Sequence, residues 1–587
     1  MTLYSLVGRF AWRHRRAYAG AALMLVIIAV LTVWIPRRIG HVIDGLVADD
    51  LTGYALAFEL AVLLAMGVAI YLLRVGWRIA LFSAAFRLGI ELRTSLYERL
   101  TLQGPEFFHG QRTGDLMALA TNDVDAIEMA AGEACLAGFD GTLTLVLVVA
   151  MMTLGVDWRL GVVALLPFPL MALAFWRISS EVHDAWRASL DRFSDLNDHV
   201  QETMAAVRTL RALGLEGRAS ADFAARAERA ATRSYDAQKW ESAYEPAVGV
   251  TLTLATVLTL GLGGYLVWRD ELTIGTLTAF TMYLSQLIWP MFATGWVLSL
   301  VERGKAAWER LDPVLRAPLS MSDAGTIGRA PEGALRFANV GFTYPGVAAG
   351  ADGTRRAALH GIDVALAPGR TLGIVGPTGA GKSTLLHLLL RHYEPATGTI
   401  TWGEVPLADF RLAALRAAMA WVPQEPFLFS ASIAANIALA RADATRAEVE
   451  EAARMADLHA DVLRFPEGYD TLVGERGVTL SGGQRQRVAI ARALLARAPL
   501  LLLDDALSAV DTGTEARILS HLRTARSGRT AIIVSHRLSA VMDADEIVVL
   551  KDGGIAERGT HDDLLRADGW YAAQWRYQQL EASLEAA

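Results

Sequence analysis

A glycine-rich segment in the second half of the chain constrains the fold more than any other part of the sequence. Residues 376–384 read Gly-Pro-Thr-Gly-Ala-Gly-Lys-Ser-Thr, after an apolar run at 372–375 and before a second one that starts at Leu385. This order predicts a strand, a phosphate-binding loop and a helix, because the pattern G-x-x-x-x-G-K-[ST] turns backbone N–H groups around an anion. A glycine-rich turn before a core helix would give no reason for a lysine at position 382.

Each residue type in this loop has an expected task in nucleotide binding. Lys382 is expected to reach the β- and γ-phosphates, and the hydroxyl of Ser383 is expected to hold Mg²⁺. The glycines permit the backbone conformations that such a loop needs. The predicted nucleotide-binding residues of the segment are Gly376, Thr378, Gly379, Ala380, Gly381, Lys382, Ser383 and Thr384.

Length and composition predict a membrane protein with more than one domain. A chain of 587 residues is too long for one hydrophobic core. Hydrophobic residues make up 53% and charged residues 20% of the chain, which is too apolar a balance for a soluble enzyme of this size. The net charge of −7 gives no indication of a nucleic-acid partner. The single cysteine, Cys135, excludes an internal disulfide and a multi-cysteine metal site.

Apolar runs of membrane length lie almost entirely in the first half of the chain. A helix of about 20 apolar residues crosses the hydrocarbon core of a bilayer. The first run follows several arginines, but it is longer than the core of a secretory signal and no small-residue cleavage site closes it. We therefore expect a retained span, preceded by a short amphipathic helix. The six predicted spans are 17–36, 55–73, 136–156, 160–176, 246–267 and 272–300.

The charges between these runs predict which ends face the cytoplasm. The connections after the second and fourth runs are long and rich in arginine, whereas the other three are acidic or very short. Positively charged flanks favour the cytoplasmic side. The two long connections, both termini and the phosphate loop are therefore predicted to be cytoplasmic, in a multi-pass protein of the cytoplasmic (inner) membrane.

Helical periodicity continues through both long connections, which predicts that the spans extend beyond the membrane. Apolar residues recur about every four positions in 84–100 and again in 190–207. The first extension breaks near Gly104-Pro105 and the second near Gly214. Each break is either an ordinary helix-to-helix corner or an element that contacts another domain.

The chain changes character between Pro313 and Pro331, where proline, glycine and serine accumulate. We interpret this stretch as a linker between a membrane domain at 1–312 and a second domain at 332–587. In the second domain predicted strands alternate with helices, which indicates an α/β domain with its ligand chemistry at strand ends.

Polar residues that follow predicted strands are candidates for the same site as the phosphate loop. Tyr344 has the ring to stack on adenine, although a lone aromatic residue more often belongs to a core. Gln424 is placed to reach metal and water, unless it lies in a surface loop. Asp504 follows a buried run and is predicted to hold Mg²⁺. His536 is a candidate contact for the γ-phosphate, although a single histidine at a strand end is more often structural.

A second glycine pair precedes a strong helical run. Ser481 is predicted to cap that helix, and Gly482 and Gly483 allow its N-terminus to approach a phosphate, with Gln484 beside them. Asp511 ends a short loop after Asp504 and is a further candidate for nucleotide binding.

In this order the motifs resemble those of the nucleotide-binding domain of ATP-binding cassette (ABC) transporters. The matching elements are the phosphate loop, Gln424, the signature at 480–484, Asp504, the loop at 508–511 and His536. The first half is similar to the six-span membrane domain of ABC exporters, so the resemblance covers essentially the whole chain. It implies an all-α transmembrane domain with long cytoplasmic helix extensions, followed by an α/β P-loop (RecA-like) ATPase domain with a helical subdomain.

The resemblance also implies how such a chain works. Two halves would dimerise and sandwich two ATP molecules with Mg²⁺, each between the phosphate loop of one half and the signature of the other. The corners near Gln111 and Leu213 would be coupling helices, the second docked on the partner's nucleotide domain. The implied function is ATP-driven export of hydrophobic or amphiphilic compounds, drug-, lipid- or peptide-like, out of the cytoplasm. Membrane lipids would surround the protein.

One departure from the family pattern lies at the expected catalytic base. Position 505 is aspartate where the family usually has the glutamate that positions the attacking water. Aspartate is one methylene shorter, and a displacement of about 1 Å can cost around 10²-fold in rate. The expected catalytic set is Asp505, His536 and Gln424, with Asp505 impaired and the signature intact for another chain's site.

Such a combination resembles one subunit of a heterodimeric multidrug-type exporter whose partner carries the working glutamate. The alternatives are a slowly hydrolysing homodimer that exports compounds or flips lipids, and a membrane-embedded nucleotide sensor that moves no solute. A second departure is the long insertion at 346–356, which leaves the stacking role of Tyr344 less secure.

Ionisable and aromatic residues in the spans bear on the substrate. Asp140 and Glu59 lie within predicted spans, where a charge is expensive and usually faces a cavity or a partner. Asp140 either contributes to a site for a cationic amphiphile or is solvated near the end of its helix. The aromatic residues of the last span fit either a cavity lining or a lipid-facing belt: Phe280, Tyr283, Trp289, Phe292 and Trp296.

Overall fold

The computed structural model describes residues 2–585 except 346–356, 475–478 and 526–528, so the insertion predicted at 346–356 lies outside the described residues. The chain forms two compact units. The first contains Met1–Leu100 and Gly114–Ala317, and the second contains Thr101–Thr113 and Pro318–Ala587. The short corner between the second and third apolar runs therefore belongs to the second unit.

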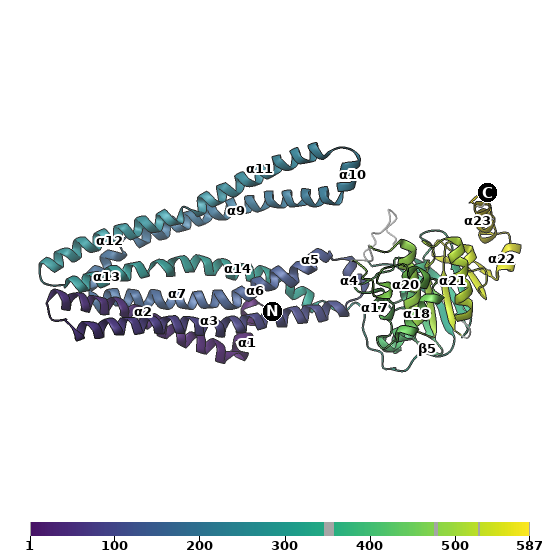
Figure 1. Cartoon of the computed structure of the whole chain (residues 1–587), viewed down its shortest axis with the longest axis horizontal. Coiled ribbons are helices and arrows are strands. Elements are labelled where there is room, and N and C mark those ends of the chain that lie inside the picture. Colours follow the sequence, from purple (N-terminus) through teal and green to yellow (C-terminus); the bar gives the residue numbers. More distant parts are fainter. Residues whose placement is uncertain (1, 346–356, 475–478, 526–528, 586–587) are drawn as a thin grey trace. The chain divides into compact units, whose positions relative to one another are not determined.

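The first unit is built from helices (Figure 1). They are α1 (Leu3–Arg13), α2 (Arg15–Val47), α3 (Tyr54–Leu102), α5 (Thr113–Ala118), α6 (Val124–Met129), α7 (Cys135–Ala150), α8 (Trp158–Leu165), α9 (Phe168–Ala205), α10 (Val207–Ala212), α11 (Glu216–Glu241), α12 (Tyr244–Trp268), α13 (Ile274–Gln286) and α14 (Ile288–Arg316). Three π-helical turns, Leu119–Asp123, Ala130–Ala134 and Met151–Val156, continue the helical path around α6 and α7.

Among the described residues, six helical stretches are long and apolar enough to cross a membrane, and each overlaps one predicted span. The prediction of six spans is thus confirmed. The helices are much longer than the apolar runs, as their periodicity predicts: α3 has 49 residues, and a helix of that length measures roughly 70 Å. Helices α9 and α11 pack side by side along these extensions (Figure 1).

The last helix of this unit runs further than the sequence indicates. Helix α14 continues through Pro313 to Arg316, into the segment interpreted as a linker. Ala307, Trp308 and Leu311 are buried in the helical unit. Tertiary packing of this face therefore stabilises the last turns in spite of the proline.

The aromatic residues of the last predicted span do not share one environment. Phe280 and Tyr283 are fully buried, and the Tyr283 hydroxyl donates a hydrogen bond of 2.8 Å to the Val33 carbonyl of α2. Trp289, Phe292 and Trp296 are exposed on the surface of this unit. A single lining or belt of aromatic residues was therefore the wrong expectation, because the change from α13 to α14 turns different faces inward.

Helices α2 and α13 approach closely at two glycines. A Cβ on Gly275 would lie 2.0 Å from the backbone oxygen of Gly40, and the carboxylate of Asp44 accepts a hydrogen bond of 2.7 Å from the Gly275 N–H. Replacing Gly275 with alanine is expected to separate the helices at a cost of about 1–3 kcal/mol. The melting temperature of the detergent-solubilised chain should fall, whereas Gly261→Ala, which meets nothing within 4 Å, should leave it unchanged.

The second unit contains two sheets within its described residues. One has the order β2-β1-β4-β5 and is antiparallel, and the other has the order β10-β9-β3-β8-β7-β6, parallel except for the edge strand β10. The strands are β1 (Leu335–Phe342), β2 (Leu359–Leu366), β3 (Thr371–Val375), β4 (Thr397–Trp402), β5 (Val405–Pro406), β6 (Met419–Val422), β7 (Leu500–Asp504), β8 (Thr530–Val534), β9 (Glu546–Lys551) and β10 (Gly554–Gly559).

Helices cover these sheets (Figure 1). They are α4 (Pro105–His109), α15 (Lys382–Leu389), α16 (Leu412–Ala417), α17 (Ile433–Ala438), α18 (Arg446–Met455), α19 (His459–Val462), α20 (Gly482–Leu495), α21 (Thr512–Ala525), α22 (His561–Arg566) and α23 (Trp570–Glu585). The central strands are buried on both faces, as a parallel sheet requires. Their carboxyl ends meet at one edge, where the predicted site residues lie.

Candidate nucleotide site

The phosphate loop joins the end of β3 to the start of α15, as the sequence predicts. Gly376, Gly379 and Gly381 have φ values of 144°, 81° and 97°, which L side chains rarely adopt. A Cβ at Gly376 would lie 2.1 Å from the backbone oxygen of Leu550 on β9. The sheet therefore restricts this position to glycine, and the loop meets the first turn of α15 with the geometry of an anion site.

The ammonium group of Lys382 is held inside this loop. The residue is 6% exposed, and its Nζ donates hydrogen bonds of 2.9 Å and 3.0 Å to the carbonyls of Gly376 and Pro377. Burial lowers the pKa of Lys382, whereas the carboxylates of Asp505 and Asp504 raise it. A cation enclosed by a loop of this shape is suited to bind phosphate oxygens.

Ser383 and Asp504 provide the oxygen atoms that Mg²⁺ prefers. The Ser383 hydroxyl donates a hydrogen bond of 3.0 Å to Oδ1 of Asp504, which ends β7 and is 3% exposed. Burial and the nearby Asp505 raise the pKa of Asp504, and the Ser383 hydroxyl and Lys382 lower it. A buried carboxylate beside a hydroxyl fits a hard divalent cation, which would also offset the buried negative charge.

Asp505 is the next residue after β7 and is turned towards the segment after β8 that contains His536, called here the histidine loop (residues 535–538). It is 7% exposed and has a φ of 47°. Its N–H donates a hydrogen bond of 2.8 Å to the Val534 carbonyl, and its Oδ1 accepts one of 3.3 Å from the His536 N–H. The carboxylate of Asp505 is thus engaged by the backbone that follows β8.

His536 follows β8 in the same group of residues. Burial and the charge of Lys382 lower the pKa of His536, and Asp505 opposes this shift. The lowered pKa favours the neutral imidazole. In that state one ring nitrogen donates a hydrogen bond and the other accepts one, which suits a contact with a phosphate group.

Tyr344 lies against the phosphate-loop helix. Its hydroxyl is 3.1 Å from the Thr384 Oγ1, and its ring contacts Phe342 and Tyr393 edge to face at 4.9 Å and 5.3 Å. Tyr344 is half-buried. The ring therefore packs on the core beside the loop, and its stacking on adenine stays a prediction.

The signature forms the start of α20, as predicted. The Ser481 hydroxyl accepts a hydrogen bond of 3.2 Å from the Gln484 N–H, and the Gln484 side chain accepts one of 3.0 Å from the Ser481 N–H. This reciprocal cap fixes the helix start. A Cβ on Gly483 would lie 2.8 Å from the Ala509 backbone oxygen, so the helix start packs directly on the loop after β7.

The remaining predicted residues are placed differently. Gln424 follows β6 at the same sheet edge and is exposed. Asp511 accepts a hydrogen bond of 2.9 Å from the Thr514 N–H at the start of α21, so in this structure its carboxylate supports that helix. These contacts leave a nucleotide role for Gln424 and Asp511 as a prediction.

Two further residues that the sequence reading missed hold these loops together. The Gln486 side chain is 3% exposed, and it donates to the Ser508 hydroxyl and accepts from the Ala509 N–H, both at 3.0 Å. Arg537 donates a hydrogen bond of 3.0 Å to the Val510 carbonyl. The available signals were their positions, because Gln486 lies three residues after Gly483 and Arg537 directly follows His536.

The corner at 101–113 contacts the nucleotide domain within the second unit. The Tyr393 hydroxyl is 3.1 Å from His109 Nδ1 of α4, and the Gly104 N–H donates a hydrogen bond of 2.8 Å to the Ser320 hydroxyl. Of the two alternatives for this corner, the structure favours an element that contacts another domain. Because Tyr393 also touches Tyr344, α4 is linked to the edge of the nucleotide site.

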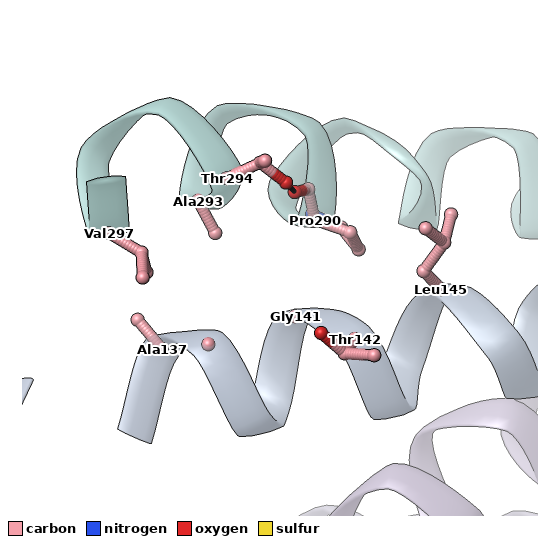
Figure 2. A pocket seen from close by; sticks show the side chains of 9 residues that line it. Ala137, Gly141, Thr142, Leu145, Pro290, Ala293, Thr294 and Val297 are labelled. Carbon is pink, nitrogen blue, oxygen red and sulfur yellow. Dashed lines mark hydrogen bonds between the residues drawn. The ribbon is translucent and has the colours of Figure 1, made fainter. Parts of the chain in front are cut away.

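The helical unit has a cavity of about 150 Å³ between α7 and α14 (Figure 2). Small residues allow the two helices to approach, and Figure 2 shows Ala137 and Gly141 facing Ala293 and Pro290 across it. Asp140 precedes Gly141 and is half-buried, with the Trp289 indole and the Arg74 guanidinium among its neighbours. A carboxylate, an aromatic ring and a cavity thus lie close together in a membrane-length region.

These features define a membrane protein joined to an ATP-binding domain, and the matching families identify the class. Residues 19–291 match the family described as ABC transporter transmembrane region, and residues 359–508 match the family described as ABC transporter. The chain belongs to the ABC transporter family and, with its apolar helices, is a multi-pass membrane protein.

Individual relatives narrow the comparison. The chain is 44% identical to the multidrug resistance-like ATP-binding protein MdlA of Escherichia coli, over 100% of this chain and 98% of that protein. It is 36% identical to the probable multidrug resistance ABC transporter ATP-binding/permease protein YheI of Bacillus subtilis, over 98% of each chain. A bacterial Atm1-family ABC exporter solved with ATP bound superposes with a TM-score of 0.78 at 30% identity, covering 96% of this chain and 98% of the exporter.

Proposed function

We propose that this chain is one half of a heterodimeric ABC exporter that moves hydrophobic or amphiphilic compounds out of the cytoplasm. ATP and Mg²⁺ would bind at the phosphate loop, with both termini and the nucleotide domain on the cytoplasmic side. The partner would be a different half-transporter that carries glutamate at the position of Asp505. Similarity to multidrug-type relatives along the whole chain supports the export part of this proposal.

Different residues of the site would bind different parts of Mg·ATP. Lys382 and the loop N–H groups would hold the phosphates, while Ser383, Asp504 and Gln424 would hold the metal ion. Bound Mg²⁺ would neutralise charge on the phosphate oxygens. Tyr344 would stack on the adenine. The cap made by Ser481 and Gln484, with Gly482 and Gly483, would present the N-terminus of α20 to the nucleotide of the partner half.

The geometry of Asp505 is the observation that carries the heterodimer proposal. Its short carboxylate accepts a hydrogen bond from the His536 N–H, and the fold at the end of β7 is otherwise intact. A carboxylate drawn towards the His536 N–H would be displaced from the position in which the longer glutamate side chain would activate water. The chain's own site would therefore bind ATP and hydrolyse it slowly, while its signature completes the partner's site.

Pairing with a different half-transporter can be tested by purifying the chain from the cells that naturally produce it. An affinity-tagged copy at native expression level is expected to co-purify with an equal amount of a different ABC half-transporter, identified by mass spectrometry. ATP hydrolysis by the pair should be at least tenfold faster than hydrolysis by the chain purified alone, because the partner supplies the glutamate. Recovery of the chain as a pure homodimer with brisk hydrolysis would contradict the proposal.

Asp140 gives a test of substrate charge. Beside the Trp289 ring, its carboxylate would favour a hydrophobic cation over a neutral analogue of the same skeleton. Asp140→Asn is expected to reduce export of the cation by about tenfold relative to the neutral analogue. Transport of both probes into inverted vesicles measures this ratio. Asp270→Asn, an exposed carboxylate in a short connection, is the matched control, and an unchanged ratio in Asp140→Asn would discard the site.

A further inference from the structure

We propose that Gln578, on the C-terminal helix α23, positions the histidine loop of the nucleotide site. The Gln578 amide donates a hydrogen bond of 2.7 Å from Nε2 to the His536 carbonyl and accepts one of 2.9 Å at Oε1 from the Leu538 N–H. A carboxamide has both a donor and an acceptor, so this one side chain closes over the backbone on both sides of Arg537. The inference rests on the proposed contact between His536 and the nucleotide.

Both backbone polar groups of His536 are engaged by other parts of the domain. The N–H donates to the Asp505 carboxylate at 3.3 Å, and the carbonyl accepts from Gln578. The next residue, Arg537, donates to the Val510 carbonyl at 3.0 Å and pairs with Glu515. The backbone is therefore held on each side of His536, which restricts the directions open to its side chain.

The helix that carries Gln578 is itself anchored. The Glu557 carboxylate accepts hydrogen bonds from the N–H groups of Trp570 and Tyr571, which satisfies two donors of the first turn. Tyr571 is fully buried, and its hydroxyl is 2.8 Å from His561 Nδ1. Gln578 lies about two helical turns further on, so the position of the amide is set by a rigid element.

This arrangement predicts a specific kinetic defect. Lys382 and Tyr344, which would bind the phosphates and the base, make no contact with Gln578 among the described hydrogen bonds. The two hydrogen bonds from Gln578 to the backbone at His536 and Leu538 are called the Gln578 clamp. Loss of this clamp should make the position of His536 less fixed while leaving ATP binding intact. Loss of one such hydrogen bond corresponds to a decrease of about fivefold in kcat, with the KM for ATP changed by less than about twofold.

Three variants of the full-length chain separate the two hydrogen bonds. Gln578→Ala removes both. Gln578→Glu keeps an acceptor for the Leu538 N–H but cannot donate to the His536 carbonyl. Gln579→Ala changes the next residue, which is exposed, and serves as the matched control.

The exchange rate of the Leu538 amide reports on the hydrogen bond to Gln578 and does not depend on ATP hydrolysis. In Gln578→Ala the amide of Leu538 is expected to exchange about fivefold faster than in the wild type. Gln578→Glu should keep the protection at Leu538, and Gln579→Ala should match the wild type. Unchanged exchange at Leu538 in Gln578→Ala, or equally faster exchange across β9, would overturn the proposal, since the second result indicates general unfolding.

Kinetics are then measured in an Asp505→Glu chain, in which hydrolysis at this chain's own site is expected to be restored. Both Gln578→Ala and Gln578→Glu should lower kcat about fivefold in that background, and Gln579→Ala should not. An unchanged kcat in Gln578→Ala, or a parallel rise in KM, would refute a positioning role. If Asp505→Glu restores no activity, the impairment assigned to Asp505 fails separately. The positioning role of Gln578 is then tested by hydrogen exchange, in which ATP should protect the amides of 535–540 less in Gln578→Ala than in the wild type.

Discussion

Asp505→Glu is expected to raise ATP hydrolysis by the purified chain by about 10²-fold, because a displacement of about 1 Å at a catalytic group costs that much in rate. Residues expected to hold the phosphates and the metal ion lie near position 505. Asp504 and Ser383 are paired at 3.0 Å, and Lys382 is buried in the phosphate loop. A longer carboxylate would restore the reach that aspartate lacks. Steady-state phosphate release at saturating Mg·ATP measures the change.

Asp505→Asn is the matched control for this result. If the native carboxylate already contributes little to catalysis, removing its charge should leave the slow rate within about twofold of the wild type. A steep loss in Asp505→Asn with no gain in Asp505→Glu would mean that aspartate acts as a competent base. The slowly hydrolysing homodimer would then become the better account of the chain.

Lys382→Ala is expected to weaken ATP binding by about 10²-fold, because it removes a buried cation from the proposed phosphate site. The Nζ of Lys382 lies within 2.9–3.0 Å of two loop carbonyls, and two buried carboxylates lie nearby. Without this charge, the phosphates would meet Asp504 and Asp505 with less compensation. Titration of the full chain with a fluorescent ATP analogue measures the affinity.

Lys551→Ala provides the comparison for this variant. Lys551 ends β9 and is exposed, so its removal changes the net charge equally while Lys382 stays in place. Affinity close to the wild type is expected for Lys551→Ala. Equal affinity in Lys382→Ala would place the nucleotide elsewhere and would remove the basis for every role assigned around the phosphate loop.

The parts of the molecule predicted correctly were those with a local pattern. Apolar runs of membrane length give six spans regardless of how the helices pack. Runs of consecutive residues also determine the phosphate loop, the capped start of α20 and the buried strand before Asp504. For these elements the local sequence and the fold agree.

Features that depend on packing between distant segments could not be read from the sequence. The clamp from Gln578 to His536 joins two segments with no shared motif, and a lone glutamine carries no signal of such a contact. Phe280 and Tyr283 are buried whereas Trp289 is exposed. This difference depends on which face of each helix meets a neighbouring helix. Pro313 suggested a helix end, but α14, whose buried face reaches Leu311, continues past the proline to Arg316.

Transport by reconstituted membranes tests the central claim most directly, namely that ATP held at the phosphate loop drives export. Inverted vesicles that contain the chain with its co-purified partner are expected to accumulate a fluorescent amphiphilic cation only when Mg·ATP is supplied. Accumulation should fall to background when the partner's catalytic glutamate is replaced by glutamine. ATP hydrolysis without accumulation across drug-, lipid- and peptide-like probes, or accumulation that needs no ATP, would contradict the account.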